Sequence, residues 1–278
     1  MACMAVKLLS HLMRVLPELR YQPPLKHLRV RLGDDLVADT DNAVLIWEPR
    51  RIVPTYAVPE RDIAATLQPA STTSDQASHP VSLGEVPRAL DPSTGFGTHT
   101  AAGEPLDVLT AGGRADGGAF RPADPDLAGY VILDFAAFDW REEDEPVISH
   151  AQDPFHRVDV RASHRHIRLE QRGIVLAESR RPHLLFEAGF PLVRYYLPRD
   201  DVLVELRPGT LHTVCAYKGR ATHYTAVADD QEIPDIALSY QDPLLDATPV
   251  RGLISFYQER LDVFVDGQVI ERPRTPWF

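Results

Sequence analysis

Hydrophobic and charged residues alternate in short runs along much of the chain. Residues 28–32 read LRVRL and residues 167–171 read IRLEQ, each with apolar residues at every second position. Turn sequences, GDD and QRG, follow both runs and lead into further apolar stretches. This period of two is typical of half-buried antiparallel strands. The pattern predicts a mainly β, β-rich α+β protein with a few short helices.

Helical spacing appears in three places. The runs ERDIAATL and RDDVLVEL follow Pro59 and Pro198, with acids first and apolar residues three to four apart. Each run predicts one short helix that begins at a proline. Residues 1–27 also have apolar residues at helical spacing, but His11, Arg14 and Pro17 interrupt them. We expect a short N-terminal helix or arm there, rather than a membrane helix or a signal peptide.

The chain contains an internal repeat. Residues 28–69 align without a gap with residues 167–208, at a constant offset that pairs glutamates, tyrosines and prolines. The sequences that begin at residues 144 and 266 also match. A repeat of this length indicates two homologous domains. We therefore predict an N-terminal arm (1–27), a first repeat domain (28–155) and a second repeat domain (165–278), with the boundary near residues 156–164.

The first repeat domain contains a long stretch of small residues. Residues 91–118 are rich in Gly, Ser, Thr and Ala, a composition that supplies few side chains for a core. This stretch predicts a flexible loop. Deletion of residues 94–118 is then expected to leave thermal stability almost unchanged.

Charge and cysteine content restrict the function classes. The 29 basic and 40 acidic side chains give a formal charge of −11, which argues against general binding to nucleic acid or to anionic membranes. Cys3 and Cys215 are too few for a disulfide framework and fit a reducing cytoplasm. We expect a small-molecule ligand as partner, and no cofactor.

The candidate chemistry lies in the stretch HTVCAYKGRATHYT, residues 212–225, which contains one of three lysines and one of two cysteines. A buried Lys218 could act as a base or form a Schiff base, whereas a surface lysine would only be solvated. Cys215 could be a reactive thiolate, but a small buried hydrophobic residue is the favoured interpretation. On a regular strand the two would point to opposite faces, and Gly219 indicates that the strand ends there.

Other polar and aromatic residues of the second repeat domain complete the candidate site. Glu187 is the third candidate catalytic residue. A substrate site is expected to be lined by Arg194, Tyr195, Tyr196, Tyr217, Tyr224, Tyr240 and Tyr257. Each alone is more often structural, and their number favours a site with a few convergent polar groups.

Comparison of the repeats divides these residues into those with an identical counterpart in the first repeat domain and those without one. Glu187 and Tyr195 have the counterparts Glu48 and Tyr56, so the fold is expected to require them. Arg194 and Tyr196 are replaced by Thr55 and Ala57. The ungapped register places Gln76 opposite Cys215 and His79 opposite Lys218. The candidate chemistry is therefore expected in the second repeat domain alone.

Metal binding has weaker support in the sequence. His212, Cys215 and His223 could supply three zinc ligands, but their spacing matches no established zinc pattern. His164 and His166 share one strand face, where exposed histidines are more common than metal ligands. We predict no metal site.

Several pieces of the chain, in order, resemble the domain of unknown function 427 family. They are LAESRRPHLLFE, RYYLPRDDV, TVCAYKG, DIALSYQDP and ISFYQERLDVFVDG, with VADTDNAVLIWEPRRIVPTYAVP upstream as in its tandem members. The resemblance implies the fold and the neighbourhood of the site, and no agreed reaction. Ala216 and Thr225 depart from the proline and tryptophan that the family commonly has there.

Family members are often labelled nucleotidyltransferase, a reaction that requires carboxylates converging on Mg²⁺. The Asp-x-Asp sequence Asp124-Pro-Asp126 lacks the Gly-Ser turn expected before it. The sequence has no phosphate-binding GxxxxGK[ST] motif either. The label is kept only as an alternative.

The favoured function is a small-molecule enzyme that uses acid-base or covalent chemistry on an anionic or carbonyl-bearing substrate. A non-catalytic binding or sequestering protein is the other main hypothesis. A perturbed pKa at Lys218 or Glu187 would favour the enzyme, because catalysis requires a titratable group poised near the working pH.

Overall fold

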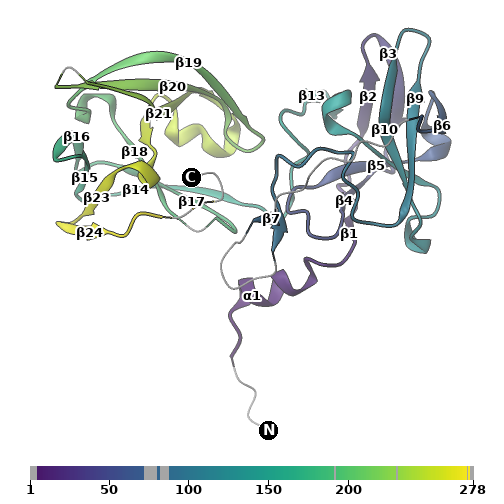
Figure 1. Ribbon diagram of the computed structural model, residues 1–278, viewed down its shortest axis with the longest axis horizontal. Coiled ribbons are helices and arrows are strands. Elements are labelled where there is room, and N and C mark those ends of the chain that lie inside the picture. The colour runs from purple at the N-terminus through teal and green to yellow at the C-terminus, as the bar shows by residue number, and fades with distance from the viewer. Residues whose placement is uncertain are drawn as a thin grey trace. The chain divides into compact units, whose positions relative to one another are not determined.

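The computed structural model describes residues 5–71, 80–81, 88–190, 192–229, 231–273 and 275. The chain divides into two compact units, Met1–Pro154 and Phe155–Phe278, called copy one and copy two (Figure 1). Each copy consists of a seven-stranded and a four-stranded antiparallel sheet. No helix in the described part of the chain is long and apolar enough to cross a membrane.

Copy one begins with the helix α1 (Leu8–Leu12) and the 3₁₀ turn η1 (Met13–Val15). Its larger sheet has the order β1 (Arg20–Gln22), β4 (Val44–Trp47), β5 (Thr55–Pro59), β11 (Tyr130–Leu133), β10 (Arg114–Pro122), β9 (Gly103–Leu109), β6 (Thr66–Pro69). Its smaller sheet has the order β13 (Glu145–Pro146), β12 (Asp139–Glu142), β2 (Leu28–Leu32), β3 (Asp35–Thr40). The remaining described elements are η2 (Glu60–Asp62), η3 (Pro125–Leu127), η4 (Phe135–Ala137) and the short pair β7 (Pro80–Val81) and β8 (Ala89–Leu90).

Copy two repeats this arrangement. Its larger sheet has the order β14 (Val158–Ala162), β17 (His183–Glu187), β18 (Arg194–Leu197), β22 (Ile254–Phe256), β21 (Gln231–Pro243), β20 (Gly219–Ala228), β19 (Glu205–Cys215). Its smaller sheet has the order β16 (Ile174–Ser179), β15 (Ile167–Gln171), β23 (Asp262–Val265), β24 (Gln268–Ile270). Its 3₁₀ turns are η5 (Arg199–Asp201), η6 (Leu245–Val250) and η7 (Gln258–Arg260).

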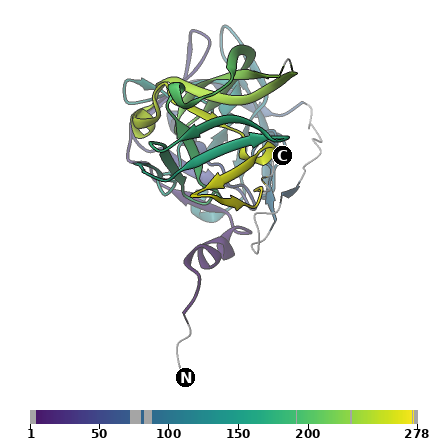
Figure 2. The ribbon, with the colours of Figure 1, turned by 90° about the vertical axis from the view of Figure 1, so that its left-hand side faces the viewer.

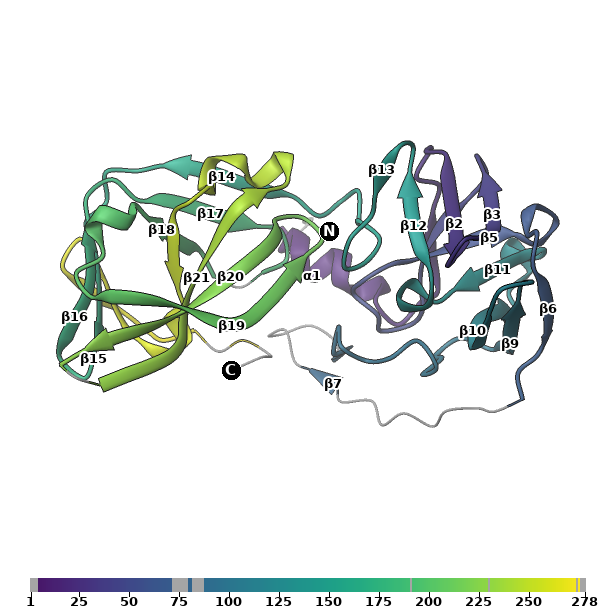
Figure 3. The same cartoon turned by 90° about the horizontal axis from the view of Figure 1, so that it is seen from above.

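The two sheet orders correspond strand by strand, which confirms the prediction of two homologous, mainly β domains. Figure 3 shows the matching groups, β6 with β9 and β10 in copy one, and β19 with β20 and β21 in copy two. The repeat extends further toward the N-terminus than expected. Arg20 pairs with Trp47 as Asp159 pairs with Phe186, so part of the predicted arm is the first strand of copy one.

Two local predictions differ from the structure in detail. The runs after Pro59 and Pro198 form one 3₁₀ turn each and then continue as strands β6 and β19. The backbone becomes extended there because Ile63 and Val202 bridge to Ala38 and Ala177 of the neighbouring strands. The expected boundary stretch, residues 156–164, contains β14, which belongs to copy two because it pairs with β17.

The expected flexible loop is another correction, because residues 91–118 contain β9 and the start of β10 inside the larger sheet. Leu106 and Val108 of β9 are buried in the core. Asp107, which is fully buried, accepts hydrogen bonds from Gly117 and from Arg114 across the hairpin. Hydrogen bonds to the buried Asp107 carboxylate therefore hold this hairpin together, although its composition is typical of a flexible loop. Deletion of residues 94–118 would remove core strands and unfold copy one.

Each larger sheet has two buried faces. One packs on the smaller sheet, and in copy two this core includes Ile167, Leu169 and Phe256. The other, called the outer face, carries a second cluster in each copy. In copy two this cluster is Val158, Leu185, Tyr196, Ala221, Tyr240, Ala247 and Val250. Strands β14 and β21 both pack against η6, so the sheet curls around this turn (Figures 1 and 2).

Candidate functional site

A buried carboxylate is the centre of the candidate site in copy two. Glu187 is the last residue of β17, and its side chain is 12% exposed. Its Oε2 atom accepts a hydrogen bond from Lys218 Nζ at 2.5 Å. Its Oε1 atom lies 3.1 Å from Nε2 of His156. One carboxylate therefore holds an ammonium group and an imidazole.

The two basic partners keep Glu187 ionised. Burial would raise the pKa of this carboxyl, but the hydrogen bond from His156 and the charge of Lys218 outweigh burial and lower the pKa to about 2. Glu187 therefore carries its negative charge across the neutral range. A group with this pKa is a poor proton donor or acceptor near neutral pH.

Lys218 points inward, as expected for a site residue. It lies in the turn between β19 and β20, and its side chain is 13% exposed. The chain turns at Gly219, whose φ of 101° disfavours any residue with a side chain. An ammonium that donates to a buried carboxylate has no free electron pair for attack on a carbonyl, so the Schiff-base role would first require this ion pair to open.

Cys215 is the last residue of β19 and pairs with Gly219 across the turn. Its thiol is free and partly exposed. This position is intermediate between the buried hydrophobic residue and the exposed thiolate that the sequence left open.

His156 was not among the sequence candidates. It precedes β14 and lies beside Tyr217, with ring centroids 4.2 Å apart. The residue at its repeat position in copy one is Pro17, so comparison of the repeats gave no signal for it. Only the pairing of β14 with the end of β17 brings it to Glu187.

The predicted tyrosines divide between the two faces of the larger sheet. Tyr196 and Tyr240 belong to the outer-face cluster, and Tyr217 packs against it. Tyr195 and Tyr224 belong to the opposite core, between the sheets. The structure therefore places these two away from Glu187, because neighbouring residues of a strand point to opposite faces.

Arg194, expected to line the substrate site, pairs with a buried carboxylate of the protein. Its guanidinium donates two hydrogen bonds, of 2.7 and 2.6 Å, to Glu259, whose side chain is 1% exposed. The rings of Phe190 and Tyr257 lie 5.8 and 5.7 Å from its Cζ atom. Arg194 is thus held in a buried ion pair of its own, whose charge Glu259 already neutralises.

Two of the histidines considered as metal ligands have other partners. His223 Nε2 lies 2.9 Å from the hydroxyl of Thr213, and His166 Nε2 lies 2.6 Å from Glu178. Within the described residues, no group of three or more His, Cys, Asp or Glu side chains is arranged to hold a metal ion.

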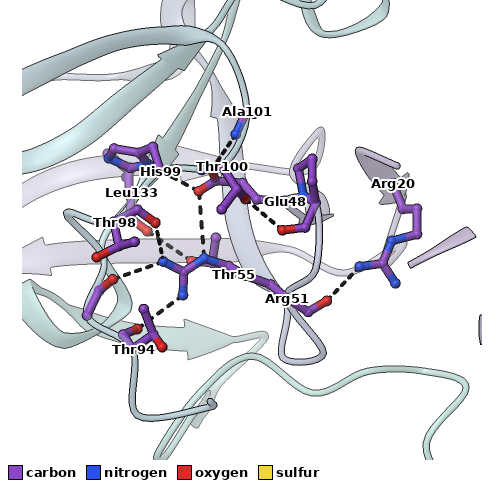
Figure 4. Close-up of polar contacts among 12 residues, drawn as sticks. Arg20, Glu48, Arg51, Thr55, Thr94, Thr98, His99, Thr100, Ala101 and Leu133 are labelled. Carbon is purple, nitrogen blue, oxygen red and sulfur yellow. Dashed lines mark hydrogen bonds and ion pairs between the residues drawn. The ribbon is translucent and has the colours of Figure 1, made fainter. Parts of the chain in front are cut away.

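Copy one has the equivalent carboxylate in a closed environment (Figure 4). Glu48 is 2% exposed, and its Oε2 accepts hydrogen bonds from the backbone N–H groups of Thr100 and Ala101. Its Oε1 lies 3.1 Å from Nδ1 of His99. Burial opposes ionisation of Glu48, but His99 and the backbone donors hold its pKa below the usual range.

Arg51 fastens the segment that covers Glu48. Its guanidinium donates to the carbonyl oxygens of Thr94, Gly95 and Thr98, and its Nε lies 3.9 Å from Glu48 (Figure 4). The Ser, Thr and Gly-rich sequence around residue 95 is therefore ordered by one arginine.

Strand pairing corrects the register between the copies. Leu106 and Tyr224 pair with the equivalent prolines Pro69 and Pro208. Counting back the same number of residues from Leu106 and from Tyr224 places Thr100, not His79, at the position equivalent to Lys218. Residues at these positions contact the equivalent glutamate in both copies. Gln76 and His79, which the ungapped alignment selected, lie outside the described residues.

Asp124 directly precedes η3, and Asp126 lies within it. The Asp124 carboxylate accepts a hydrogen bond from the backbone N–H of Asp126 and caps this turn. Asp124 therefore has a structural role, because its carboxylate caps η3.

Comparison with known proteins identifies one family. The sequence model described as "Domain of unknown function (DUF427)" matches residues 20–78 and 159–267. The two segments begin at β1 and β14, the equivalent first strands of the two copies. No curated protein matches the chain significantly.

Proposed function

Because the chain belongs to the DUF427 family, whose description names no reaction, we propose a function from the site itself. Copy two is a small-molecule enzyme that performs acid-base chemistry on an anionic or carbonyl-bearing substrate. The observation that carries this proposal is the clamp of His156 and Lys218 on the buried carboxylate of Glu187.

The roles within this cluster follow from its hydrogen bonds. Imidazole is the usual proton-transfer group near neutral pH, and a carboxylate on one ring nitrogen fixes its orientation. His156 is therefore the proposed acid-base residue and Glu187 its positioning residue. Lys218 balances the carboxylate and supplies positive charge for an anionic group of the substrate. The small number of cysteines favours the cytoplasm as the setting.

Proton exchange at a carbon next to a carbonyl tests this proposal. Pyruvate is anionic and carbonyl-bearing, and loss of its methyl protons in D₂O can be followed by proton NMR. We expect the full chain to accelerate the exchange above the buffer rate, and His156→Gln to abolish the acceleration. His166→Gln, which changes a histidine just before β15, is the matched control. Equal rates for the wild type and His156→Gln would reject the acid-base role.

A non-catalytic binding protein is the second candidate. The low pKa of Glu187 favours it, because both carboxylate oxygens are already engaged and the ion pair is fixed. Pyruvate binding that depends on Lys218, without faster proton exchange, would support this candidate over the enzyme.

Nucleotidyl transfer is the alternative with the least support. Its metal chemistry requires converging carboxylates, whereas Asp124 of the Asp-x-Asp pair caps η3. Binding of Mg²⁺ with ATP that depends on Asp124 and Asp126 would favour it.

A further inference from the structure

The outer face of copy two carries several buried polar side chains. Tyr196 of β18 is 2% exposed, Tyr240 of β21 is 4% exposed and His223 of β20 is fully buried. Ala221, two residues before His223, pairs with Tyr240 and packs in the same cluster as both tyrosines. Because side chains alternate along a strand, His223 projects to this face as well.

These groups have unused hydrogen-bonding capacity. The Nδ1 atom of His223 is buried without a hydrogen-bond partner in the described part of the chain. The Thr213 hydroxyl lies 2.9 Å from the other ring nitrogen and holds the ring in place. Among the described residues, the hydroxyls of Tyr196 and Tyr240 form no hydrogen bond, but unlike His223 Nδ1 they are not fully closed off from solvent. A buried polar atom such as His223 Nδ1 is rarely left without a partner unless a ligand or water completes it.

Copy one shows that the fold does not require these groups. The ungapped repeat places Ala57 at the position of Tyr196. Strand pairing places Pro105 at the position of His223 and Pro122 at that of Tyr240. None of the three replacements has a side chain that can form a hydrogen bond.

The three groups are uncharged near neutral pH. Burial raises the pKa of Tyr196 and of Tyr240, so both keep their protons. Burial also lowers the pKa of His223, which favours the neutral imidazole. Protonated tyrosine hydroxyls can donate to an oxygen atom, and the neutral ring can donate or accept.

We infer that Tyr196, Tyr240 and His223 form an uncharged subsite that takes the carbonyl or hydroxyl oxygen of the ligand, with His223 as a specificity residue. This inference rests on the proposed function, in which the anionic end of the same ligand lies at Lys218. The ligand class it names is a carboxylate compound with a second, neutral oxygen, such as a 2-oxo or hydroxy acid. A plain carboxylate of similar size would lack the second contact.

Two probes that differ by one carbonyl test the subsite. Pyruvate and propionate are both monoanions, and pyruvate alone has the 2-oxo group. Each is titrated into the full chain while the imidazole nitrogens of ¹⁵N-labelled histidines and the Lys218 signal are followed by NMR. We expect both acids to shift Lys218, and pyruvate alone to shift His223. His223→Phe should weaken pyruvate binding about ten-fold, as expected for one lost hydrogen bond in a dry site, and leave propionate binding unchanged.

The outcomes separate this inference from the proposed function. Shifts at Lys218 with no response of His223 to pyruvate would overturn the subsite and leave the proposed function standing. No response at either residue would overturn both. Thr213→Val, which frees the ring without filling its space differently, guards against misfolding of His223→Phe and should also weaken pyruvate selectively. Equal weakening of both acids by Thr213→Val would count against the subsite.

Discussion

Glu48 and Glu187 occupy the same place in two copies of one fold, but their surroundings differ. Glu48 receives backbone N–H groups and His99 from a single covering segment. Glu187 receives His156 and Lys218, which come from two separate elements. The side chain of Glu48 is 2% exposed and that of Glu187 is 12% exposed. Both copies therefore have a glutamate at this position. The groups that donate hydrogen bonds to it differ, and only in copy two is its side chain partly accessible to a ligand.

The same difference extends across the outer face. Copy one fills it with aromatic rings, and His99 stacks on Phe120 at 3.8 Å with Phe96 at its edge. Copy two has the hydroxyls of Tyr196 and Tyr240 instead. A face that the chain fills itself is structural, whereas a face with unused polar groups is suited to a ligand.

Truncation of Glu48 should have the largest effect. Glu48→Ala leaves two backbone N–H groups and His99 without their acceptor in a buried site, and we expect a loss of about 3–5 kcal/mol in the unfolding free energy of copy one. Urea denaturation followed by tryptophan fluorescence measures it, because Trp47 and Trp140 lie in the core of copy one. A loss below about 1 kcal/mol would show that the covering segment does not depend on Glu48.

The second-largest effect should be the pH dependence that Glu187 gives to the unfolding free energy of copy two. Its pKa is about 2 in the folded chain against an ordinary value of 4.5, so its contribution is complete above pH 4.5 and is lost as pH falls towards 2. The contribution is on the order of 3 kcal/mol. Glu187→Gln should flatten the pH dependence of the copy two unfolding free energy in this window. An unchanged slope would contradict the lowered pKa of Glu187 in the folded chain.

Replacement of Lys218 should cost less than truncation of Glu48. Lys218→Met keeps much of the side-chain volume and leaves Glu187 with His156, so we expect copy two to lose about 1–3 kcal/mol. Thr100→Val is the matched variant in copy one. It should cost less, because the backbone N–H group of residue 100 still donates to Glu48. Comparable losses in the two copies would contradict the side-chain origin of the copy two clamp.

The smallest effect should be equal in the two copies. Thr40 donates to Asp62, and Ser179 donates to Asp201 at the equivalent position. Thr40→Val and Ser179→Ala should each lower the unfolding free energy by about 1 kcal/mol. Unequal losses, measured by urea denaturation, would show that the copies differ beyond their outer faces.

Much of the fold could be predicted from local sequence. The period of two in residues 28–32 and 167–171 corresponds to β2 and β15. The constant offset predicted that the two copies share one fold. The strands within residues 91–118 could not be predicted from composition, because their order comes from the buried hairpin contact of Asp107 and the distant contact of Arg51.

The site was predictable only in part. Lys218 and Glu187 were selected from the sequence, and the structure brings them together. His156 was missed because its contact depends on strand pairing, and Tyr224 was included because sequence does not reveal which face a tyrosine occupies. The ungapped register failed after Pro69 because the two copies have connections of different length between equivalent strands.

That difference in connection length bears on how the two copies fold. In copy two, residues 216–218 alone join β19 to β20, whereas residues 70–102 separate the equivalent strands β6 and β9. Closing the longer connection costs about 2 kcal/mol more in chain entropy. A tight hairpin forms within microseconds, whereas distant pairing slows folding. We therefore expect copy two to fold faster than copy one, although it is synthesised last.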